Sequence, residues 1–420
     1  MHRLTSSPTG RFATFAATAT VFIALSLGFT KAQAEKISEK PAAKPVVAPK
    51  ASTKAAPAKK KVAQKGKPAA KAKDAKAPTA SERRGNVLAI KTAARAPKAE
   101  PGPAYATRDD AMRFADDLAD RRNLDRAWVR DTIGQANFLP VVTRLMAPAP
   151  AGTPKNWRLY RSRFIDTYRI NAGMAFWEAN QAALERAERE YGVPADIIVG
   201  IVGVETIYGQ QTGNFRVLDA LTTLAFDFPA AHPRAAERTA YFRGELEQVL
   251  SLASRTGVDP LSLKGSYAGA MGWPQFMPSS WHKYAIDFDG DGKVDLFESQ
   301  ADVVGSVANY FKAFGWEKGL PTHYPVAFDT TRLNKDALLA PDILPTFNVA
   351  GFTAKGAVLE GAALAHPGLL ALVELQNGAD EPSYVAGTQN FYTITRYNQS
   401  SYYAMAVIEL GREVRAALGR

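Results

Sequence analysis

The feature that most constrains this chain is the segment 35–104, which consists largely of lysine, alanine and proline without an apolar period. Such a segment cannot bury a core, so we expect an extended linker there and confine the fold to 105–420. Residues 1–34 carry a net charge of +3 and residues 35–100 carry +13, against +11 for the whole chain, which leaves −5 for residues 101–420. The basic charge therefore belongs to the N-terminal segments, and no nucleic-acid-binding domain is implied.

The first 34 residues have the pattern of a secretory signal: a basic start, an apolar stretch and the small-residue triplet Ala32-Gln33-Ala34. We predict cleavage after Ala34. A transmembrane anchor is the alternative, but polar residues and a glycine interrupt the stretch, which falls short of the roughly 20 apolar residues that span a bilayer. The chain contains no cysteine, which excludes a lipid-modified cysteine, disulfides and thiolate metal sites. We therefore expect that the protein has no stable membrane anchor after cleavage and that it is not a lipoprotein.

The linker is expected to act as a solvated spacer, because positive charge alone specifies no partner. Electrostatic binding to an anionic wall polymer or a membrane surface is an additional role that this charge allows.

Helical patterns dominate the first two thirds of the folded part. The pattern of residues 174–191 predicts one long helix, which Gly192 ends and which is followed by a helix that begins at Pro194. Further helical patterns cover residues 107–118, 235–254 and 300–314.

The pattern changes near Gly319. Residues 320–390 contain short apolar pieces such as 369–375, separated by turn residues, which indicates small antiparallel strands. Helix resumes at about Ser400. We therefore expect an α+β fold that is mainly α. Its expected parts are a helical region at 105–318, a β-rich insertion at 319–390 and a C-terminal return to the helical region at 391–420.

The segment 194–209 contains the most informative acidic residue of the chain, Glu205. Ile197, Ile201 and Glu205 are four residues apart, so the carboxylate projects from the apolar stripe of a helix. Removal from water favours the protonated form and raises the pKa, which keeps a glutamic acid able to donate a proton near neutral pH. This is the profile of a general acid for glycosidic bond cleavage. The alternative is a structural glutamate that pairs with an arginine such as Arg216 or caps a backbone group.

A second segment, 264–280, is rich in glycine, polar and aromatic residues. Glycines allow the backbone to approach a ligand closely. Ser266 and Gln275 can hydrogen-bond to sugar hydroxyls, and Trp273 or Phe276 can stack on a ring face. A turn backed by core aromatics explains the glycines but not this density of polar and aromatic groups. Tyrosines gather again near the C-terminus, where such amphipathic rings favour a carbohydrate cleft.

The segment 287–298 fits the calcium-loop pattern D-x-D-x-D-G-x5-E in full. Its candidate oxygen ligands are Asp287, Asp289 and Asp291, the carbonyl of Lys293, and Glu298 as the closing bidentate group. Because there is one such loop, we expect a structural Ca²⁺ site rather than a sensor. The alternative is an acidic turn without a metal. No phosphate-binding glycine loop is present, and we predict no organic cofactor.

Six sequence blocks between residues 160 and 410 resemble the lytic murein transglycosylase B family, glycoside hydrolase family 103, and occur in the same order. The blocks are Gly203-Val-Glu-Thr206, Leu218-Asp-Ala-Leu221, Gly265-Ser-Tyr-Ala-Gly-Ala-Met-Gly272, Gln275-Phe-Met-Pro-Ser-Ser280, Gly305-Ser-Val-Ala-Asn-Tyr-Phe311 and Phe391-Tyr-Thr-Ile-Thr-Arg-Tyr-Asn398.

The resemblance implies a lysozyme-like helical core with a single EF-hand-like calcium loop and a small inserted antiparallel β subdomain. It implies a periplasmic enzyme that acts on peptidoglycan glycan strands, and it makes proteins of cell-wall synthesis or division candidate partners of the linker. The implied reaction cleaves the β-1,4 bond between N-acetylmuramic acid and N-acetylglucosamine without water and leaves a 1,6-anhydromuramoyl end. Glu205 corresponds to the sole catalytic acid and base. The corresponding cleft residues are Tyr160, Ser266, Gln275, Phe276, Tyr310, Tyr397, Asn398 and Tyr403.

In the implied mechanism, Glu205 protonates the leaving oxygen and then takes the proton of the muramoyl C6 hydroxyl, which attacks C1. The nucleophile belongs to the substrate, so a second carboxylate is dispensable. The muramoyl N-acetyl group, through an oxazolinium intermediate, is an alternative first nucleophile. The competing functions are a hydrolytic muramidase, in which water attacks, and a non-catalytic peptidoglycan-binding or scaffolding protein.

Two positions depart from the family pattern. The resemblance places the last calcium ligand beyond position twelve of the loop, where Asp302 lies in this chain, so Glu298 and Asp302 compete for the closing role. The dipeptide Trp273-Pro274 replaces a looser pair beside the expected cleft, which affects the expected preference of the neighbouring subsite.

Overall fold

The computed structural model describes residues 102–148 and 154–420, so the predicted signal peptide and nearly all of the predicted linker lie outside the described residues. The first described residues already pair with the helical part, because Gly102 N donates to Phe138 O at 2.8 Å. None of the helices in these two ranges is both long and apolar enough to span a bilayer.

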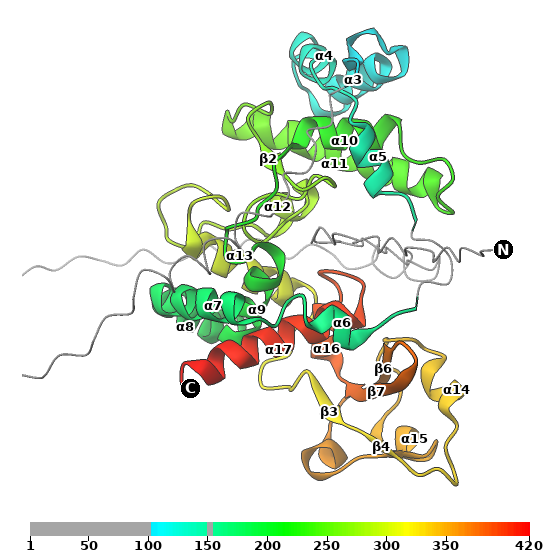
Figure 1. Ribbon diagram of the computed structural model, residues 1–420. Coiled ribbons are helices and arrows are strands. Elements are labelled where there is room, and N and C mark those ends of the chain that lie inside the picture. Colours follow the sequence, from blue (N-terminus) through cyan, green and yellow to red (C-terminus); the bar gives the residue numbers. More distant parts are fainter. Residues whose placement is uncertain (1–101, 149–153) are drawn as a thin grey trace, which may run out of the picture. The chain divides into compact units, whose positions relative to one another are not determined.

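Helices make up most of the described chain (Figure 1). The α-helices are α3 (Asp109–Arg122), α4 (Arg126–Gly134), α5 (Pro140–Leu145), α6 (Trp157–Arg161), α7 (Thr167–Ala179), α8 (Gln181–Tyr191), α9 (Ala195–Thr206), α10 (Val217–Phe226), α11 (Ala235–Thr256), α12 (Pro278–Tyr284), α13 (Gln300–Ala313), α14 (Lys335–Leu339), α15 (Val349–Thr353), α16 (Gln389–Ile394) and α17 (Ser401–Ala417). Short 3₁₀ helices are η1 (Tyr105–Thr107) and η2 (Gly361–Ala365). The strands are β1 (Phe215–Arg216), β2 (Lys264–Gly265), β3 (His323–Pro325), β4 (Ala327–Phe328), β5 (Ala357–Val358), β6 (Ala371–Asn377) and β7 (Asp380–Gly387).

Helix α9 lies in the core and packs along α17 (Figure 1). Every residue of α9 is buried, since α7, α8, α13 and α17 all pack against it. Two glycines allow α9 and α17 to approach closely. A Cβ on Gly200 would lie 2.2 Å from Val407 O, and a Cβ on Gly411 would lie 2.0 Å from Asp196 O. A side chain at either position would force the two helices apart.

The single helix predicted for residues 174–191 is wrong, because the structure has two helices that are separated at Asn180. Asn180 Nδ2 donates to Phe176 O at 2.8 Å and to Gln300 Oε1 of α13 at 2.6 Å. Asparagine side chains compete for backbone groups in this way, and the backbone of Asn180 (φ −116°, ψ 19°) is not helical. The predicted end at Gly192 is confirmed, since Gly192 has a left-handed backbone (φ 74°) and caps α8.

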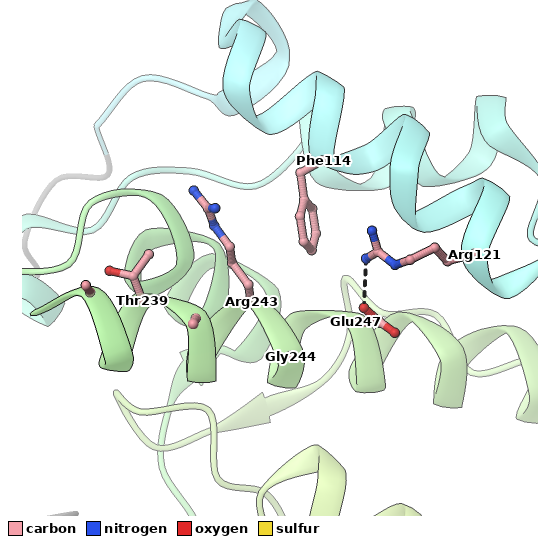
Figure 2. A pocket seen from close by; sticks show the side chains of 8 residues that line it. Phe114, Arg121, Thr239, Arg243, Gly244 and Glu247 are labelled. Carbon is pink, nitrogen blue, oxygen red and sulfur yellow. Dashed lines mark hydrogen bonds and ion pairs between the residues drawn. The ribbon is translucent and has the colours of Figure 1, made fainter. Parts of the chain in front are cut away.

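The other helical patterns are confirmed by α3, α11 and α13. Helix α3 faces α11, as Figure 2 shows. Phe114 points toward α11, and Arg121 Nη2 donates to Glu247 Oε2 at 2.9 Å. Arg122 also donates to Glu247. Helix α11 packs on α10, and α10 packs on α5, so the N-terminal helices are continuous with the core.

The strands predicted after Gly319 are confirmed as an antiparallel sheet of order β3-β7-β6 and a two-stranded pair, β4 with β5. In the larger sheet Val373 pairs with Val385. A small separate core, which includes Phe352 and Leu372, lies beneath these strands. The short helices α14 and α15 were not predicted. The mainly helical α+β fold class is confirmed.

The short pair of β1 with β2 determines where the glycine-rich loop lies. Phe215 pairs with Gly265. Because β1 follows α9 and β2 begins the loop, this pairing holds the loop beside the end of α9. A Cβ on Gly265 would lie 2.1 Å from Ala270 O, so the loop can close on itself only with glycine at this position.

Replacement of Gly200 by alanine is expected to lower the free energy of unfolding by about 2 kcal/mol, because the new Cβ would collide with the backbone of α17. The matched control is Gly244→Ala, since Gly244 lies in α11 and a Cβ there meets nothing within 4 Å. This control should raise the free energy of unfolding by about 0.5–1 kcal/mol through helix propensity. Urea unfolding measures both, and equal effects would contradict the close helix contact.

Candidate active site

Glu205 lies near the C-terminal end of α9, and only 6% of its surface is exposed. It lines a narrow cavity of about 50 Å³. Tyr403 Oη of α17 donates to Glu205 Oε1 at 2.5 Å. Burial raises the pKa of the carboxyl to about 7, while the hydrogen bond from Tyr403 lowers it. A carboxyl with a pKa near neutrality can both donate and accept a proton at physiological pH.

The structure does not pair Glu205 with Arg216, the alternative considered from the sequence. Arg216 Nη2 instead donates to Asp219 Oδ1 at 2.5 Å and to Gln135 O at 2.7 Å. Burial, and no neighbouring charge, is therefore the main influence on the Glu205 carboxyl.

Aromatic rings form one wall of the cavity. The ring centroids of Tyr310 and Tyr397 are 4.8 Å apart, and Phe276 lies 5.6 Å and 5.9 Å from them. Tyr397 stacks on Tyr403 at 6.4 Å. Tyr397 Oη donates to Pro274 O at 2.6 Å, so this hydroxyl fixes the ring in place and leaves its face available. Flat apolar faces of this kind suit sugar rings.

Two amides from different segments also line the cavity. Gln275 Nε2 donates to Thr212 O at 3.0 Å and to Gly272 O at 2.9 Å, so Gln275 holds its own loop in shape. Asn398 Oδ1 is buried and has no hydrogen-bond partner among the described residues. A buried acceptor without a partner is unfavourable unless a ligand supplies a donor. Asn398 Oδ1 is therefore an acceptor whose hydrogen-bonding capacity is unused by the described residues.

Three predicted cleft residues, Ser266, Tyr160 and Tyr403, are not among the residues that line the cavity, although Tyr403 is hydrogen-bonded to Glu205. Ser266 Oγ accepts from Ala270 N at 3.0 Å and closes the turn that carries the lining residue Ala270. Tyr160 belongs to an aromatic cluster, with its ring centroid 5.8 Å from that of Tyr402. Burial and, to a lesser degree, the charge of Glu205 raise the pKa of Tyr160, so this ring lies within electrostatic reach of the carboxyl.

Sequence reasoning missed three lining residues, which are Ala270, Met277 and Ser280. The first two have no polar group that could indicate a site. Ser280 belongs to the first turn of α12. The signal that could have identified all three was their position inside the glycine-rich segment 264–280.

A larger cavity of about 620 Å³ lies between α3 and α11 (Figure 2). None of the predicted site residues lines it. Its acidic lining residue, Glu247, is already bonded to Arg121 and Arg122, and these ion pairs help to lower the pKa of Glu247. A carboxyl that is held ionised is a poor proton donor, so Glu247 is less suited than Glu205 to act as a general acid.

The structure brings three carboxylates of the acidic loop together. Oxygen atoms of Asp287, Asp289 and Asp302 lie within 4.8 Å of one another. Hard oxygen ligands at this spacing fit the preferences of Ca²⁺, which takes several carboxylate and carbonyl oxygens. The other predicted carboxylate ligands, Asp291 and Glu298, are not part of this group, and the predicted carbonyl ligand of Lys293 stays a prediction.

The side chain of Asp302 also organises the acidic loop, because it accepts hydrogen bonds from the backbone of the loop. It lies in the first turn of α13 and is almost completely buried. Asp302 Oδ1 accepts from Phe288 N at 2.6 Å, and Oδ2 accepts from Asp295 N at 2.8 Å. Glu298 is exposed, and its backbone N–H donates to Asp295 Oδ1 at 3.0 Å. The geometry therefore favours Asp302 over Glu298 as the residue that closes a cation site.

Comparison with known proteins gives a consistent assignment. Residues 106–412 match the family model described as the Transglycosylase SLT domain. Over 325 residues the chain is 41% identical to the membrane-bound lytic murein transglycosylase B of Escherichia coli K12, which covers 75% of this chain and 85% of that protein.

Solved structures agree with this match. The E. coli lytic transglycosylase Slt35 in complex with bulgecin A has a TM-score of 0.66 and 39% identity, covering 77% of this chain and 98% of Slt35. Slt35 has also been solved in complex with calcium. Pseudomonas aeruginosa SltB3 in complex with NAG-anhNAM-pentapeptide has a TM-score of 0.58 and 27% identity, covering 72% of this chain and 79% of SltB3.

The raised pKa of Glu205 predicts a pH-dependent stability. Because folding raises this pKa from 4.5 to about 7, the contribution of the carboxyl to stability is full below pH 4.5 and is lost as the pH rises through 7. Glu205→Gln removes the titration, so between pH 4 and pH 8 the variant should gain about 3 kcal/mol relative to wild type. Urea unfolding across this range measures the gain. The exposed Glu178→Gln serves as the control, and parallel pH curves for all three proteins would contradict the raised pKa.

If the acidic loop binds Ca²⁺, the melting temperature of the protein should rise with the calcium concentration. At a calcium concentration of 100 times Kd, binding to the native state alone should add about 2.7 kcal/mol of stability, and chelation should remove it. Glu298→Gln is expected to retain this calcium-dependent rise, whereas Asp302→Asn should lose it. Thermal melts with and without Ca²⁺ test both variants, and the opposite pattern would assign the closing role to Glu298.

Proposed function

This chain belongs to the Transglycosylase SLT domain family, and we propose that it is a lytic transglycosylase that cleaves peptidoglycan and leaves 1,6-anhydromuramoyl ends. The observation that carries this proposal is the buried Glu205 carboxyl, whose pKa of about 7 suits proton transfer. A relative, SltB3, has been solved with NAG-anhNAM-pentapeptide, a ligand with an anhydro sugar.

Glu205 acts twice in the proposed reaction. Its protonated carboxyl first gives the proton to the glycosidic oxygen as the bond from this oxygen to C1 breaks. The resulting carboxylate then accepts the proton of the C6 hydroxyl of the same muramoyl residue, while the hydroxyl oxygen bonds to C1. Glu205 ends the cycle protonated, so the proton balance closes without water. The hydrogen bond from Tyr403 favours the ionised form between the two steps.

The cavity supports a mechanism with one carboxylate. Among the nine residues that line it, Glu205 is the only one with an acidic side chain. Retaining and inverting glycosidases use two carboxyl groups that are roughly 5–9.5 Å apart, the second as nucleophile or as the base for water. A hydroxyl of the substrate itself replaces that second group, because an intramolecular nucleophile has a high effective concentration.

The remaining lining residues are proposed to position the sugar. The ring of Tyr397 can contact a sugar ring, and Asn398 Oδ1 can accept a hydrogen bond from the N-acetyl N–H group or a hydroxyl. Phe276 is only 2% exposed and supports the wall from within. Ser266, Gln275, Tyr160 and Tyr310 are proposed to hold the loop and the aromatic wall in shape. The positioning of C6 relative to C1 then rests on side chains that are already ordered.

We also propose a structural Ca²⁺ ion that is held by Asp287, Asp289 and Asp302. When bound, the ion offsets two of the three negative charges of these clustered carboxylates and stabilises the loop by mass action. The proposed location is the periplasm, reached by the signal peptide and without a lipid anchor, since the chain has no cysteine. The E. coli relative, in contrast, is named a membrane-bound enzyme.

The decisive test is mass spectrometry of the soluble products that the mature protein releases from purified peptidoglycan sacculi, without prior reduction. Wild type and Glu178→Gln should release anhydromuropeptides, whereas Glu205→Gln should lose at least about 1,000-fold in rate, because the acid and the base are removed together. Reducing-end products would instead make the protein a muramidase. Binding to sacculi without any soluble product would make it a non-catalytic peptidoglycan-binding protein.

A further inference from the structure

Trp273, in the glycine-rich segment 264–280, is bonded to the acidic loop in two ways. Trp273 N donates to Leu296 O at 2.9 Å, and the indole Nε1 donates to Phe297 O at 2.8 Å. The backbones also approach closely, since a Cβ on Gly272 would lie 2.6 Å from Leu296 O. Trp273 therefore joins the cavity-lining loop to the second half of the acidic loop.

The same residue is bonded to the helix that carries Glu205. Trp273 O accepts from Thr206 Oγ1 at 2.9 Å, and Thr206 directly follows Glu205. Thr206 Oγ1 in turn accepts from Gly209 N at 3.0 Å. The indole ring covers this turn, because a Cβ on Gly209 would lie 2.3 Å from a Trp273 ring atom.

The turn that Trp273 covers is strained. Ile207 (φ 51°) and Tyr208 (φ 54°) have left-handed backbones without being glycine, and Gly209 (φ 85°) continues the turn. A left-handed backbone is especially unfavourable for a β-branched residue such as isoleucine. Strained backbones persist only where surrounding contacts hold them. The contacts of Trp273 are suited to this role, and the end of α9 depends on them.

The acidic loop fixes the atoms to which Trp273 is bonded. Asp302 Oδ2 accepts from Asp295 N at 2.8 Å, and Asp295 Oδ1 accepts from Phe297 N at 2.8 Å. Asp302 belongs to the carboxylate group that fits Ca²⁺. A continuous series of hydrogen bonds thus runs from these carboxylates through Asp295, Phe297 and Trp273 to Thr206.

We propose that Trp273 is a positioning residue, whose indole N–H transmits the order of the calcium loop to the end of the helix that carries Glu205. The proposal rests on the proposed function only where it concerns turnover. Calcium, by ordering the loop, then protects the strained turn after Glu205 as well as the loop itself, although Glu205 touches no ligand of the ion.

The test is hydrogen–deuterium exchange of the full chain, with Ca²⁺ and after chelation. In wild type, chelation should speed exchange both in peptides that cover 295–298 and in peptides that cover 206–209. In Trp273→Phe, which keeps an aromatic ring but lacks the N–H, exchange at 206–209 should already be about tenfold faster and should not respond to Ca²⁺, whereas 295–298 should still respond.

The matched control is Trp281→Phe, because Trp281 is a buried tryptophan whose ring also packs against the acidic loop, with its centroid 5.4 Å from that of Phe297. This variant should keep the calcium response at 206–209. The proposal is overturned if chelation of wild type leaves 206–209 unchanged, if Trp273→Phe keeps the response, or if Trp281→Phe loses it too. Should Trp273→Phe not fold, Thr206→Val removes the last hydrogen bond of the series and decides by the same criteria.

Kinetics add a second readout. Trp273→Phe should lower kcat about tenfold and change KM by less than about twofold, since the variant disturbs the placement of Glu205 and not the sugar-binding faces. An about tenfold change in KM with kcat unchanged would overturn the positioning role of Trp273. The exchange experiment needs no turnover, so an inactive wild type would refute the proposed function and leave the result for Trp273 standing.

Discussion

The structure depends on one unfavourable arrangement, a carboxyl group buried at the end of an apolar helix. An isolated ionised carboxylate is very costly in such surroundings, and proteins relieve the cost by keeping the group protonated. Burial therefore raises the pKa of Glu205 to about 7, and the single hydroxyl of Tyr403 offsets only part of the rise. The same property that destabilises the fold at alkaline pH gives the protein a proton donor at neutral pH.

The rest of the frame holds this carboxyl in place. Helix α9 carries Glu205 and α17 carries Tyr403, and the two helices approach through Gly200 and Gly411. The short pairing of β1 with β2 sets the glycine-rich loop against the end of α9. Trp273 then connects this loop to the acidic loop. Each contact joins segments far apart in the chain, so the cavity is a product of tertiary packing and not of any one motif.

Some of this could be read from the sequence. The four-residue spacing of Ile197, Ile201 and Glu205 predicts the burial of the carboxyl, because helical periodicity alone decides which side chains share a face. The strands after Gly319 follow from apolar pieces between turn residues. Glycine after Tyr191 predicts the end of α8 for the same local reason. These features depend on neighbours in sequence.

Other features could not be read, because they depend on distant partners. The break at Asn180 requires Gln300 of α13, which no local pattern reveals. Tyr403, which meets Glu205, is 198 residues away in the chain, so only the family resemblance, and no local pattern, indicates that it belongs to the site. The choice of Asp302 over Glu298 follows from the path of the loop into α13, which carries Asp302 inward and leaves Glu298 exposed. Ala270 and Met277 likewise line the cavity only because of how the chain packs around it.

The most direct test of the account is a ¹³C NMR titration of the glutamate side-chain carboxyls, with Glu205→Gln used to assign the signal of Glu205. We predict that this carboxyl titrates with a pKa near 7. A Glu205 signal that titrates near 4.5, the ordinary value of a glutamate, would contradict this prediction, since the carboxyl would then be ionised at neutral pH and could not serve as the acid.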